Sequence, residues 1–225
     1  MLNPRTISVV AWDLDNTLFD RDAALFRFFA WYLARLDRHS PERGGPALLE
    51  AIMALDVGGD SDRLAFCRQV LVLLGHNPET AGHFWEVMRR KLPEFVLPEK
   101  GVAACLTRLR GCYLLAIISN GGGTLQRAKM YRAGVARYFA PEHVFISGEV
   151  GFDKPDPRFF ETALRTLDRQ PEQVLYVGDH PTKDIAGAAA VGMQTCWVSR
   201  GQSAPPGLRS DAVIATPWRL LPLLR

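Results

Sequence analysis

"VVAWDLDNTLFD", residues 9–20, is the stretch that decides the fold of this chain. The run from Thr6 to Trp12 is largely β-branched and apolar, and it ends at Asp13 and Asp15. Unbroken apolar runs are typical of strands buried on both faces, as in a parallel sheet. Carboxylates avoid the ends of buried strands unless a neighbouring group compensates their charge. The stretch therefore predicts a central strand that delivers two acids to a charged site.

Four later runs are similar to this first strand, a fifth at Asp211–Ala215 is a shorter candidate, and helical patterns separate most of them. The stretch Pro157–Leu167 has apolar residues at helical spacing, and Asp156 before it can cap its first turn. The small-residue stretch Lys183–Gly192 predicts a second helix, close to the sheet, with Gly192 just past its end. Strands alternating with helices predict an α/β fold, a Rossmann-like, doubly wound parallel sheet with right-handed crossovers. The five further strands are expected at Cys112–Ser119, His143–Ser147, Gln173–Gly178, Gln194–Ser199 and Asp211–Ala215.

Residues 20–97 break this alternation and contain no convincing strand. Turn-forming residues at 39–46, 56–62 and 75–80 divide the stretch into four expected helices. We therefore predict an α/β core formed by residues 1–19 and 98–225, with a helical insert at 20–97. The apolar positions at helical spacing are Leu25, Phe28, Phe29, Tyr32, Leu33 and Leu36, then Leu64, Cys67, Leu71 and Leu74, then Phe84, Val87, Met88 and Leu92.

The composition limits the classes of protein to consider. With 48% hydrophobic and 23% charged residues among 225, the chain is expected to be globular. No apolar run reaches the ~20 residues of a membrane helix, and the N-terminus lacks a signal peptide's apolar core, so we expect a cytoplasmic protein. A net charge of +3 without a dense basic tract favours neither nucleic-acid nor membrane partners. The four scattered cysteines predict reduced, mostly buried thiols, and the oligomeric state is left open.

Polar residues follow four of the expected strands at the point where each strand ends. In a parallel α/β sheet, ligands bind beyond the carboxyl ends of the strands, so these side chains are expected at one rim. They are Asp13, Asp15 and Thr17 after the first strand, Ser119 and Asn120 at the end of the second, Lys154 after the third, and Asp179, His180 and Asp184 after the fourth.

Converging carboxylates repel one another, and a hard divalent cation removes that repulsion. Mg²⁺ favours a few carboxylates together with water and phosphate oxygens. Lys154 supplies a positive partner for an anion, while Ser119 and Asn120 supply hydrogen-bond donors before a helix start that favours phosphate. One carboxylate facing phosphorus can act as a nucleophile, and a second can donate and accept a proton. The pattern therefore predicts phosphoryl chemistry with Mg²⁺ as the cofactor.

Four motifs in this order resemble those of the haloacid dehalogenase superfamily. "DLDNTLFD" looks like the first motif, DxDx(T/V), and "IISN" resembles the second, a strand ending in Ser or Thr. "KPDPRFF" is similar to the third, a lysine before a helix, and "GDHPTKD" to the fourth, GDxxxxD. Together they span Asp13 to Asp184, most of the chain. The insert resembles the helical cap of the superfamily's C1 class, so the resemblance implies a phosphatase-type enzyme with a mobile cap.

The resemblance implies a role for each matching residue. Asp13 would attack the phosphoryl group and form an aspartyl-phosphate. Asp15 would protonate the leaving oxygen and then activate the water that hydrolyses the intermediate. Ser119 would bind the transferring group, Lys154 would neutralise its charge, and Thr17 would orient the first loop.

The resemblance also implies a set of metal ligands, namely Asp13, the backbone carbonyl of Asp15, Asp179 and, directly or through water, Asp184. Asp184 has an alternative role as the ion-pair partner of Lys154 or Lys183. The remaining candidates also have plainer interpretations: Asp20 as a helix cap, Asn120 as a turn cap rather than a phosphate ligand, His180 as a structural rim residue, and Phe26 and Trp31 as core aromatics rather than cleft residues.

The leading functional hypothesis is a Mg²⁺-dependent hydrolase that acts on a small phosphorylated metabolite. Asp15 argues against halide chemistry, because dehalogenases of the superfamily lack this second acid. A phosphotransferase similar to phosphoglucomutase would keep both acids and is the first alternative. A non-catalytic scaffold is the second, although converging charges without a metal would cost stability.

Overall fold

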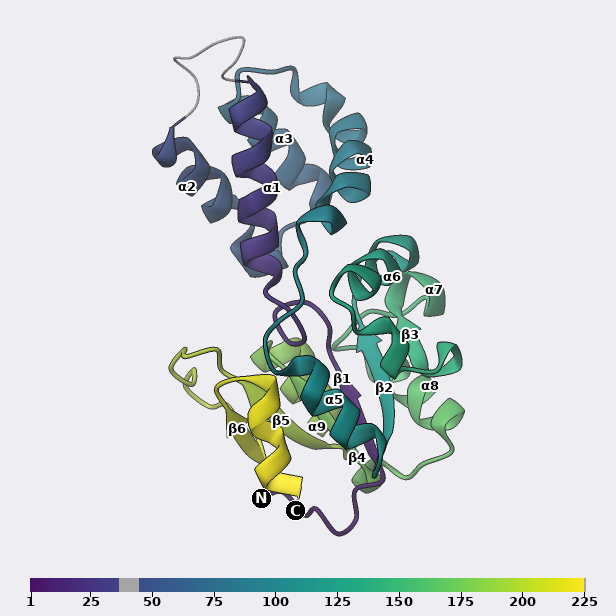
Figure 1. Ribbon diagram of the computed structural model, residues 1–225. Coiled ribbons are helices and arrows are strands. Elements are labelled where there is room, and N and C mark those ends of the chain that lie inside the picture. Colours follow the sequence, from purple (N-terminus) through teal and green to yellow (C-terminus); the bar gives the residue numbers. More distant parts are fainter. Residues whose placement is uncertain (37–44, 225) are drawn as a thin grey trace. The chain divides into compact units, whose positions relative to one another are not determined.

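The computed structural model describes residues 1–36 and 45–224, so the turn expected at 39–46 lies mostly outside the described residues (Figure 1). The chain divides into two compact units. Met1–Asp20 together with Leu97–Arg225 form one, which we call the core unit, and Arg21–Val96 form the other, the helical unit. Within the described ranges, no helix has both the length and the apolar character needed to cross a membrane.

The described residues of the core unit form one sheet of six parallel strands in the order β3-β2-β1-β4-β5-β6. Each of the six predicted runs contains one strand, and the predicted α/β fold is confirmed. The order reverses between the neighbours β1 and β4, which opens a ligand crevice at their carboxyl ends. The strands are β1 (Val9–Trp12), β2 (Leu114–Ser119), β3 (Val144–Ile146), β4 (Val174–Gly178), β5 (Gln194–Val198) and β6 (Ala212–Ile214).

Strand β1 lies in the centre of the sheet, and both of its faces are covered. Val9 and Ala11 share an apolar cluster with helix α8 (Pro157–Leu167), while the alternate residues Val10 and Trp12 point to the other face and are also fully buried. This two-sided burial explains why the strand is apolar throughout. As predicted, Asp156 caps α8 by accepting the N–H of Arg158 at 2.9 Å.

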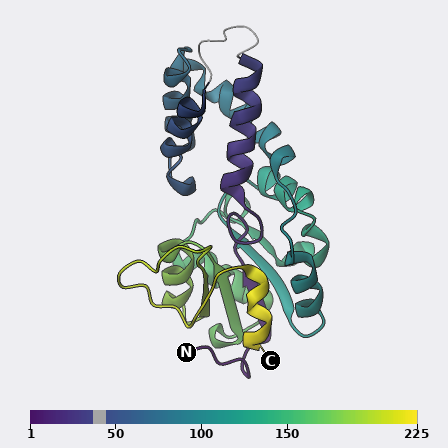
Figure 2. The ribbon, with the colours of Figure 1, turned by 60° about the vertical axis from the view of Figure 1, so that its left-hand side comes forward.

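The other helices of the core unit surround this sheet. Helix α5 packs against the C-terminal segment η8, and the two lie side by side in Figures 1 and 2. The helix predicted at 183–192 is replaced by a π-helical turn, η7, that runs directly into the short helix α9. Gly192 follows with a φ of +88°, as its predicted position past the helix end requires. The elements are α5 (Val102–Arg110), α6 (Gly123–Arg132), α7 (Ser147–Val150), η7 (Pro181–Ala186), α9 (Gly187–Ala190) and η8 (Pro217–Leu224).

The helical unit contains no strand within its described residues, 21–36 and 45–96. Its helices are α1 (Arg21–Leu36), α2 (Pro46–Leu55), α3 (Arg63–Leu73) and α4 (Ala81–Lys91), and they enclose an apolar core of their own. Two residues of the predicted apolar stripes, Leu64 and Val87, are exposed instead. Each lies about a quarter turn from the centre of its helix's buried face, because successive residues are ~100° apart.

A buried ion cluster joins the start of α1 to the connection between α2 and α3. Asp56 is 2% exposed and accepts hydrogen bonds from the guanidinium groups of Arg21 and, at 3.0 Å, of Arg63. Burial alone would raise the pKa of the Asp56 carboxyl, but the hydrogen bonds and charges of the two arginines outweigh it, and the pKa is lowered. The cluster therefore depends on an ionised Asp56.

Asp56→Ala is expected to destabilise the protein by about 3–5 kcal/mol at neutral pH, because it leaves the buried Arg21 without its main counter-charge. Urea titration measures the loss, and hydrogen exchange locates it in the helical unit. Because the folded-state pKa lies below the unfolded value, the stabilisation is present above about pH 4 and is lost as the pH falls further. Glu86→Ala removes an exposed, solvent-screened ion pair of the same unit and should cost far less. Equal losses in the two variants would contradict the prediction.

Candidate active site

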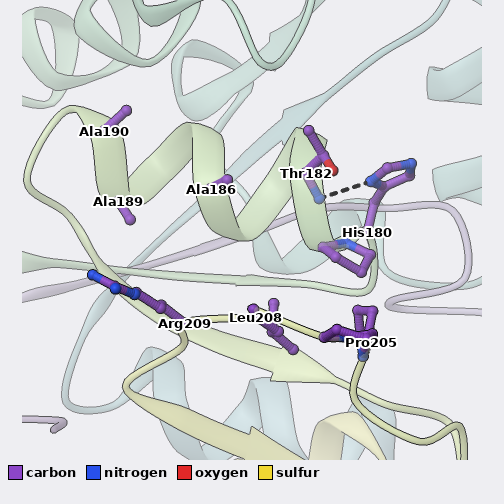
Figure 3. Close-up of a pocket in the computed structure, with 11 residues that line it drawn as sticks. His180, Thr182, Ala186, Ala189, Ala190, Pro205, Leu208 and Arg209 are labelled. Atoms are coloured by element: carbon purple, nitrogen blue, oxygen red, sulfur yellow. Dashed lines mark hydrogen bonds between the residues drawn. The ribbon is translucent and has the colours of Figure 1, made fainter.

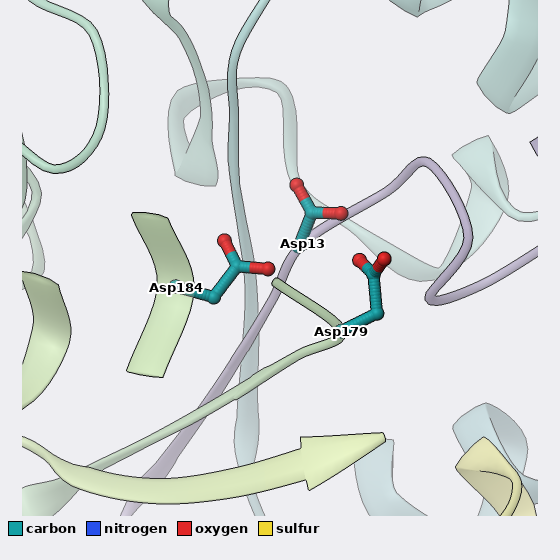
Figure 4. A group of neighbouring side chains, drawn as sticks. All are labelled: Asp13, Asp179 and Asp184. Atoms are coloured by element: carbon teal, nitrogen blue, oxygen red, sulfur yellow. The ribbon is translucent and has the colours of Figure 1, made fainter. Parts of the chain in front are cut away.

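Three carboxylates meet at the carboxyl ends of β1 and β4, and Figure 4 shows them turned toward one another. Asp13 directly follows β1, Asp179 directly follows β4, and Asp184 lies in η7. One oxygen atom from each lies within 4.8 Å of the other two. The backbone N–H of Asp13 donates to the carbonyl oxygen of Val177 at 2.8 Å, so strand pairing itself places Asp13 beside β4. The structure thus brings together three of the predicted site residues.

Lys154 joins these carboxylates from the loop before α8. Its Nζ lies 2.6 Å from Oδ1 of Asp13, 2.7 Å from Oδ1 of Asp184 and 2.8 Å from the hydroxyl oxygen of Tyr176. An ammonium group has three N–H donors, so each of them has an acceptor here. The residue is 4% exposed, and a charge so buried is tolerated only when it is paired in this way.

Tyr176 is a site residue that sequence reasoning missed. It lies within β4, and its hydroxyl donates to the backbone oxygen of Ile118 at 2.7 Å while accepting from Lys154. In the sequence it looked like one more core aromatic of an apolar strand. The sequence feature that could have identified it is its hydroxyl group, because the hydroxyl of a buried tyrosine normally has a hydrogen-bond partner.

The electrostatics of this group favour an additional cation. Three carboxylates face one ammonium, which leaves a formal excess of two negative charges. Burial raises the pKa of Asp13 to about 6, although Lys154 opposes the shift, and burial together with Asp184 and Asp13 holds the pKa of Asp179 well above its ordinary value. Burial alone would lower the pKa of Lys154, but the two carboxylates that it contacts outweigh this and raise it. An oxygen-seeking divalent cation fits both the donor set and the charge.

Three of the predicted polar residues surround this group. The Thr17 hydroxyl donates to Oδ1 of Asp179 at 3.0 Å, which links the loop after β1 to the end of β4. Ser119 ends β2 and is 1% exposed. The side chain of Asn120 exchanges two hydrogen bonds with the backbone of Lys154, at 3.0 and 2.8 Å. Asn120 thus holds the lysine loop in place, and its contact with phosphate stays a prediction.

Both oxygens of Asp184 are engaged by the protein. Oδ1 accepts from Lys154, and Oδ2 accepts the backbone N–H of His180 at 2.9 Å. A Cβ atom at Gly178 would lie 2.4 Å from Oδ2 of Asp184, so only glycine allows this approach. These contacts support the ion pair between Asp184 and Lys154, while a metal-binding role for Asp184 stays a prediction.

Asp15 points to a different set of partners from those of Asp13. Its carboxylate contacts Lys129 and Gln126 of α6, at 2.8 and 3.0 Å. Sequence reasoning missed both residues. The signal that could have found them is their spacing of three in α6, the first helix after Ser119, because residues three apart share one helical face.

The loop after β1 is also supported from the end of β5. The guanidinium of Arg200 donates to the backbone oxygens of Asn16 and Thr17 and pairs with Glu99, with a closest distance of 2.7 Å to that carboxylate. Asn16 has a φ of +55°, a conformation that asparagine tolerates better than most residues. Arg200, which follows the fifth strand, therefore helps to fix the turn between Asp15 and Thr17.

His180 has a structural role in the fold. Its ring Nδ1 accepts the backbone N–H groups of Thr182 and Lys183, each at 3.1 Å, and so caps the start of η7. Figure 3 shows it on the wall of a pocket of about 670 Å³. The opposite wall comes from the connection between β5 and β6, drawn yellow-green in Figure 2, and includes Pro205 and Leu208. These contacts support the plainer interpretation of His180.

Comparisons with known proteins agree with this geometry. The family model described as haloacid dehalogenase-like hydrolase matches residues 7–192. The chain belongs to the haloacid dehalogenase-like (HAD-like) hydrolase family. It is 36% identical over 220 residues to a phosphoserine phosphatase of Thermus thermophilus, covering 84% of this chain and 87% of that protein. It is 31% identical over 229 residues to a glyceraldehyde 3-phosphate phosphatase of Pyrococcus furiosus, covering 98% and 94% of the two chains.

Solved structures extend the comparison to the fold of this HAD-like hydrolase. The HAD-hydrolase YfnB of Bacillus subtilis, in a structure bound to magnesium, superposes with a TM-score of 0.82 at 22% identity, covering 97% of this chain and 99% of that one. The predicted family is confirmed by the family model and by the two relatives named above. The two relatives are both named as phosphatases, and the predicted enzyme class agrees with them.

Proposed function

We propose that this HAD-like hydrolase is a Mg²⁺-dependent phosphomonoesterase that uses Asp13 as a covalent nucleophile. The observation that carries the proposal is the position of Asp13, which contacts the buried ammonium of Lys154 and stands beside two further carboxylates. A nucleophile, an anion partner and an oxygen-rich cation site at one strand end are the elements that phosphoryl transfer requires. The relatives named above act on phosphoserine and on glyceraldehyde 3-phosphate, which supports a small phosphorylated metabolite as the substrate.

Mg²⁺ would be held by Asp13, Asp179 and the backbone carbonyl of Asp15, with Asp184 acting directly or through water. The metal would supply positive charge to the phosphoryl oxygens and so reduce the repulsion between the carboxylate and the phosphate dianion. The formal excess of two negative charges around Lys154 supports a divalent rather than a monovalent ion.

The residues of the chain divide the chemistry between them. Asp13 attacks phosphorus, the ester oxygen departs with a proton from Asp15, and an aspartyl-phosphate forms. Asp15 then takes a proton from the water that attacks this intermediate, which releases phosphate and restores Asp13. Lys154 neutralises charge on the transferring group, and Ser119 and Asn120 bind its oxygens. Thr17 orients the loop after β1.

We assign substrate choice to the insert at residues 20–97 and catalysis to the core at 1–19 and 98–225. An insert of this kind acts as a cap that opens for substrate and closes to keep bulk water from the phosphorylated enzyme. Its movement would be absorbed near residues 19–22 and 96–100.

The proposal is tested with purified protein and a panel of phosphorylated metabolites, with p-nitrophenyl phosphate as a general probe. Phosphate release is expected with Mg²⁺ and not with EDTA. Slow release that requires an added sugar bisphosphate would instead indicate a phosphotransferase similar to phosphoglucomutase. No phosphate release from any compound in the presence of Mg²⁺ would contradict the proposal.

The effect of metal removal on stability should depend on pH. In the metal-free protein the raised pKa values of Asp13, about 6, and Asp179 mean that stability is lost as the pH rises from about 4 through 6. Mg²⁺ competes with protons for these carboxylates, so the gain in Tm on adding Mg²⁺ is expected to grow across the same range. Thermal unfolding in excess MgCl₂ and in EDTA measures it. Asp179→Asn should show little gain, and a gain in the unaltered protein that is equal at every pH would contradict the prediction.

A further inference from the structure

The carboxylate of Asp15 is held by two buried side chains of α6. Nζ of Lys129 lies 2.8 Å from both Oδ1 and Oδ2, and Nε2 of Gln126 lies 3.0 Å from Oδ2. The side chain of Lys129 is 5% exposed, whereas that of Asp15 is 27% exposed. Side chains of α6 therefore hold the carboxylate of Asp15 from one side, while part of the carboxylate stays accessible to solvent.

Gln126 also connects Asp15 to the end of β2, where we expect phosphate to bind. Its Nε2 also lies 3.0 Å from Oγ of Ser119 and 3.0 Å from the backbone oxygen of Asn120. The amide NH2 of Gln126 has two N–H groups, which are shared among Asp15, Ser119 and the backbone oxygen of Asn120. A Cβ atom at Gly121, where φ is +133°, would lie 3.1 Å from the Gln126 side chain, so glycine keeps this space available.

Burying the charge of Lys129 is costly. A lysine is almost never fully buried unless it is paired, and the partner here is Asp15. The ion pair joins residues that are 114 positions apart in the sequence. It fixes Asp15, the acid that carries out the proton transfers in the proposed function.

We propose that Lys129, supported by Gln126, is the positioning residue for Asp15. It holds the carboxylate in the orientation from which protons pass to the leaving group and from the attacking water. The inference rests on the proposed function and assigns Lys129 no contact of its own with substrate or metal. An untethered carboxylate samples several rotamers, and the lost orientation lowers the rate of each proton transfer.

Lys129→Met and Lys129→Arg test this with p-nitrophenyl phosphate and Mg²⁺. The methionine variant is expected to lose about 10–100-fold in kcat, with KM falling as the phosphorylated enzyme accumulates, and the arginine variant to recover most of the loss in kcat. p-Nitrophenolate departs with little help from an acid, whereas hydrolysis of the phosphorylated Asp13 needs Asp15 as a base. The methionine variant should therefore release p-nitrophenol in a burst of about one equivalent and then turn over slowly. Arg132→Met, an exposed change in the same helix, is the matched control and should behave as the unaltered protein.

The same substitution in an Asp15→Asn background decides whether Lys129 acts through Asp15. The lifetime of phosphorylated Asp13, followed by intact-protein mass spectrometry, should then change less than about twofold on adding Lys129→Met. An equal loss in both backgrounds, or an unchanged kcat in the single variant, would overturn the inference. If the methionine variant does not fold, Lys129→Gln carries the same comparison. Failure of the proposed function would be seen separately, as no turnover by the unaltered protein.

Discussion

Asp13→Asn is expected to lower Mg²⁺-dependent turnover of p-nitrophenyl phosphate by at least ~1000-fold, because an amide cannot replace a covalent nucleophile. Substrate affinity should change far less than kcat, since Lys154 and the donors at the end of β2 are retained. The phosphorylated peptide that contains Asp13 should be found by mass spectrometry in the acid-quenched unaltered enzyme and be absent from the variant.

Loss of structure would not account for this result. Burial raises the pKa of Asp13, so the ionised carboxylate destabilises the metal-free folded protein at neutral pH. The asparagine variant should therefore be at least as stable as the unaltered protein in EDTA, while Lys154 keeps its contacts with Asp184 and Tyr176. Turnover close to normal in this variant would rule out the covalent mechanism.

Lys154→Met is expected to impair both stability and activity. Without the ammonium, the carboxylates of Asp13 and Asp184 are left buried and unpaired, which should cost about 3–5 kcal/mol at neutral pH in EDTA. Turnover should fall at least ~100-fold, because charge on the transferring phosphoryl group is no longer neutralised. Chemical denaturation and steady-state kinetics with p-nitrophenyl phosphate measure the two effects.

The stability loss should be partly reversed by Mg²⁺ and by acid, since either one reduces the repulsion between the remaining carboxylates. Arg108→Met, a change at an exposed cationic residue of the core unit, provides the comparison and should alter neither stability nor turnover. A methionine variant with full stability in EDTA at neutral pH would show that the carboxylates do not depend on Lys154.

Much of the fold was readable from local patterns. The strand that leads to Asp13 is recognisable because both of its faces are buried, and α8 because its apolar residues repeat every three to four positions, from Phe160 to Leu167. The same spacing rule wrongly predicted that Leu64 and Val87 are buried, because spacing alone does not locate the centre of a helix's buried face. It also missed the π-helical turn around Asp184, where the carboxylate contacts Lys154 and the backbone of His180.

The sequence by itself determined which strand ends carry acids, which carries a lysine, and in what order they follow one another. Only the tertiary structure decided the partners: Tyr176 for Lys154, Lys129 and Gln126 for Asp15, and Arg200 for the loop between Asp15 and Thr17. The physical reason is the separation along the sequence of the residues that interact. Periodicity and helix caps come from neighbours a few residues apart, whereas a buried lysine and its counter-charge, 114 positions distant, meet only when strand order and helix packing bring them together.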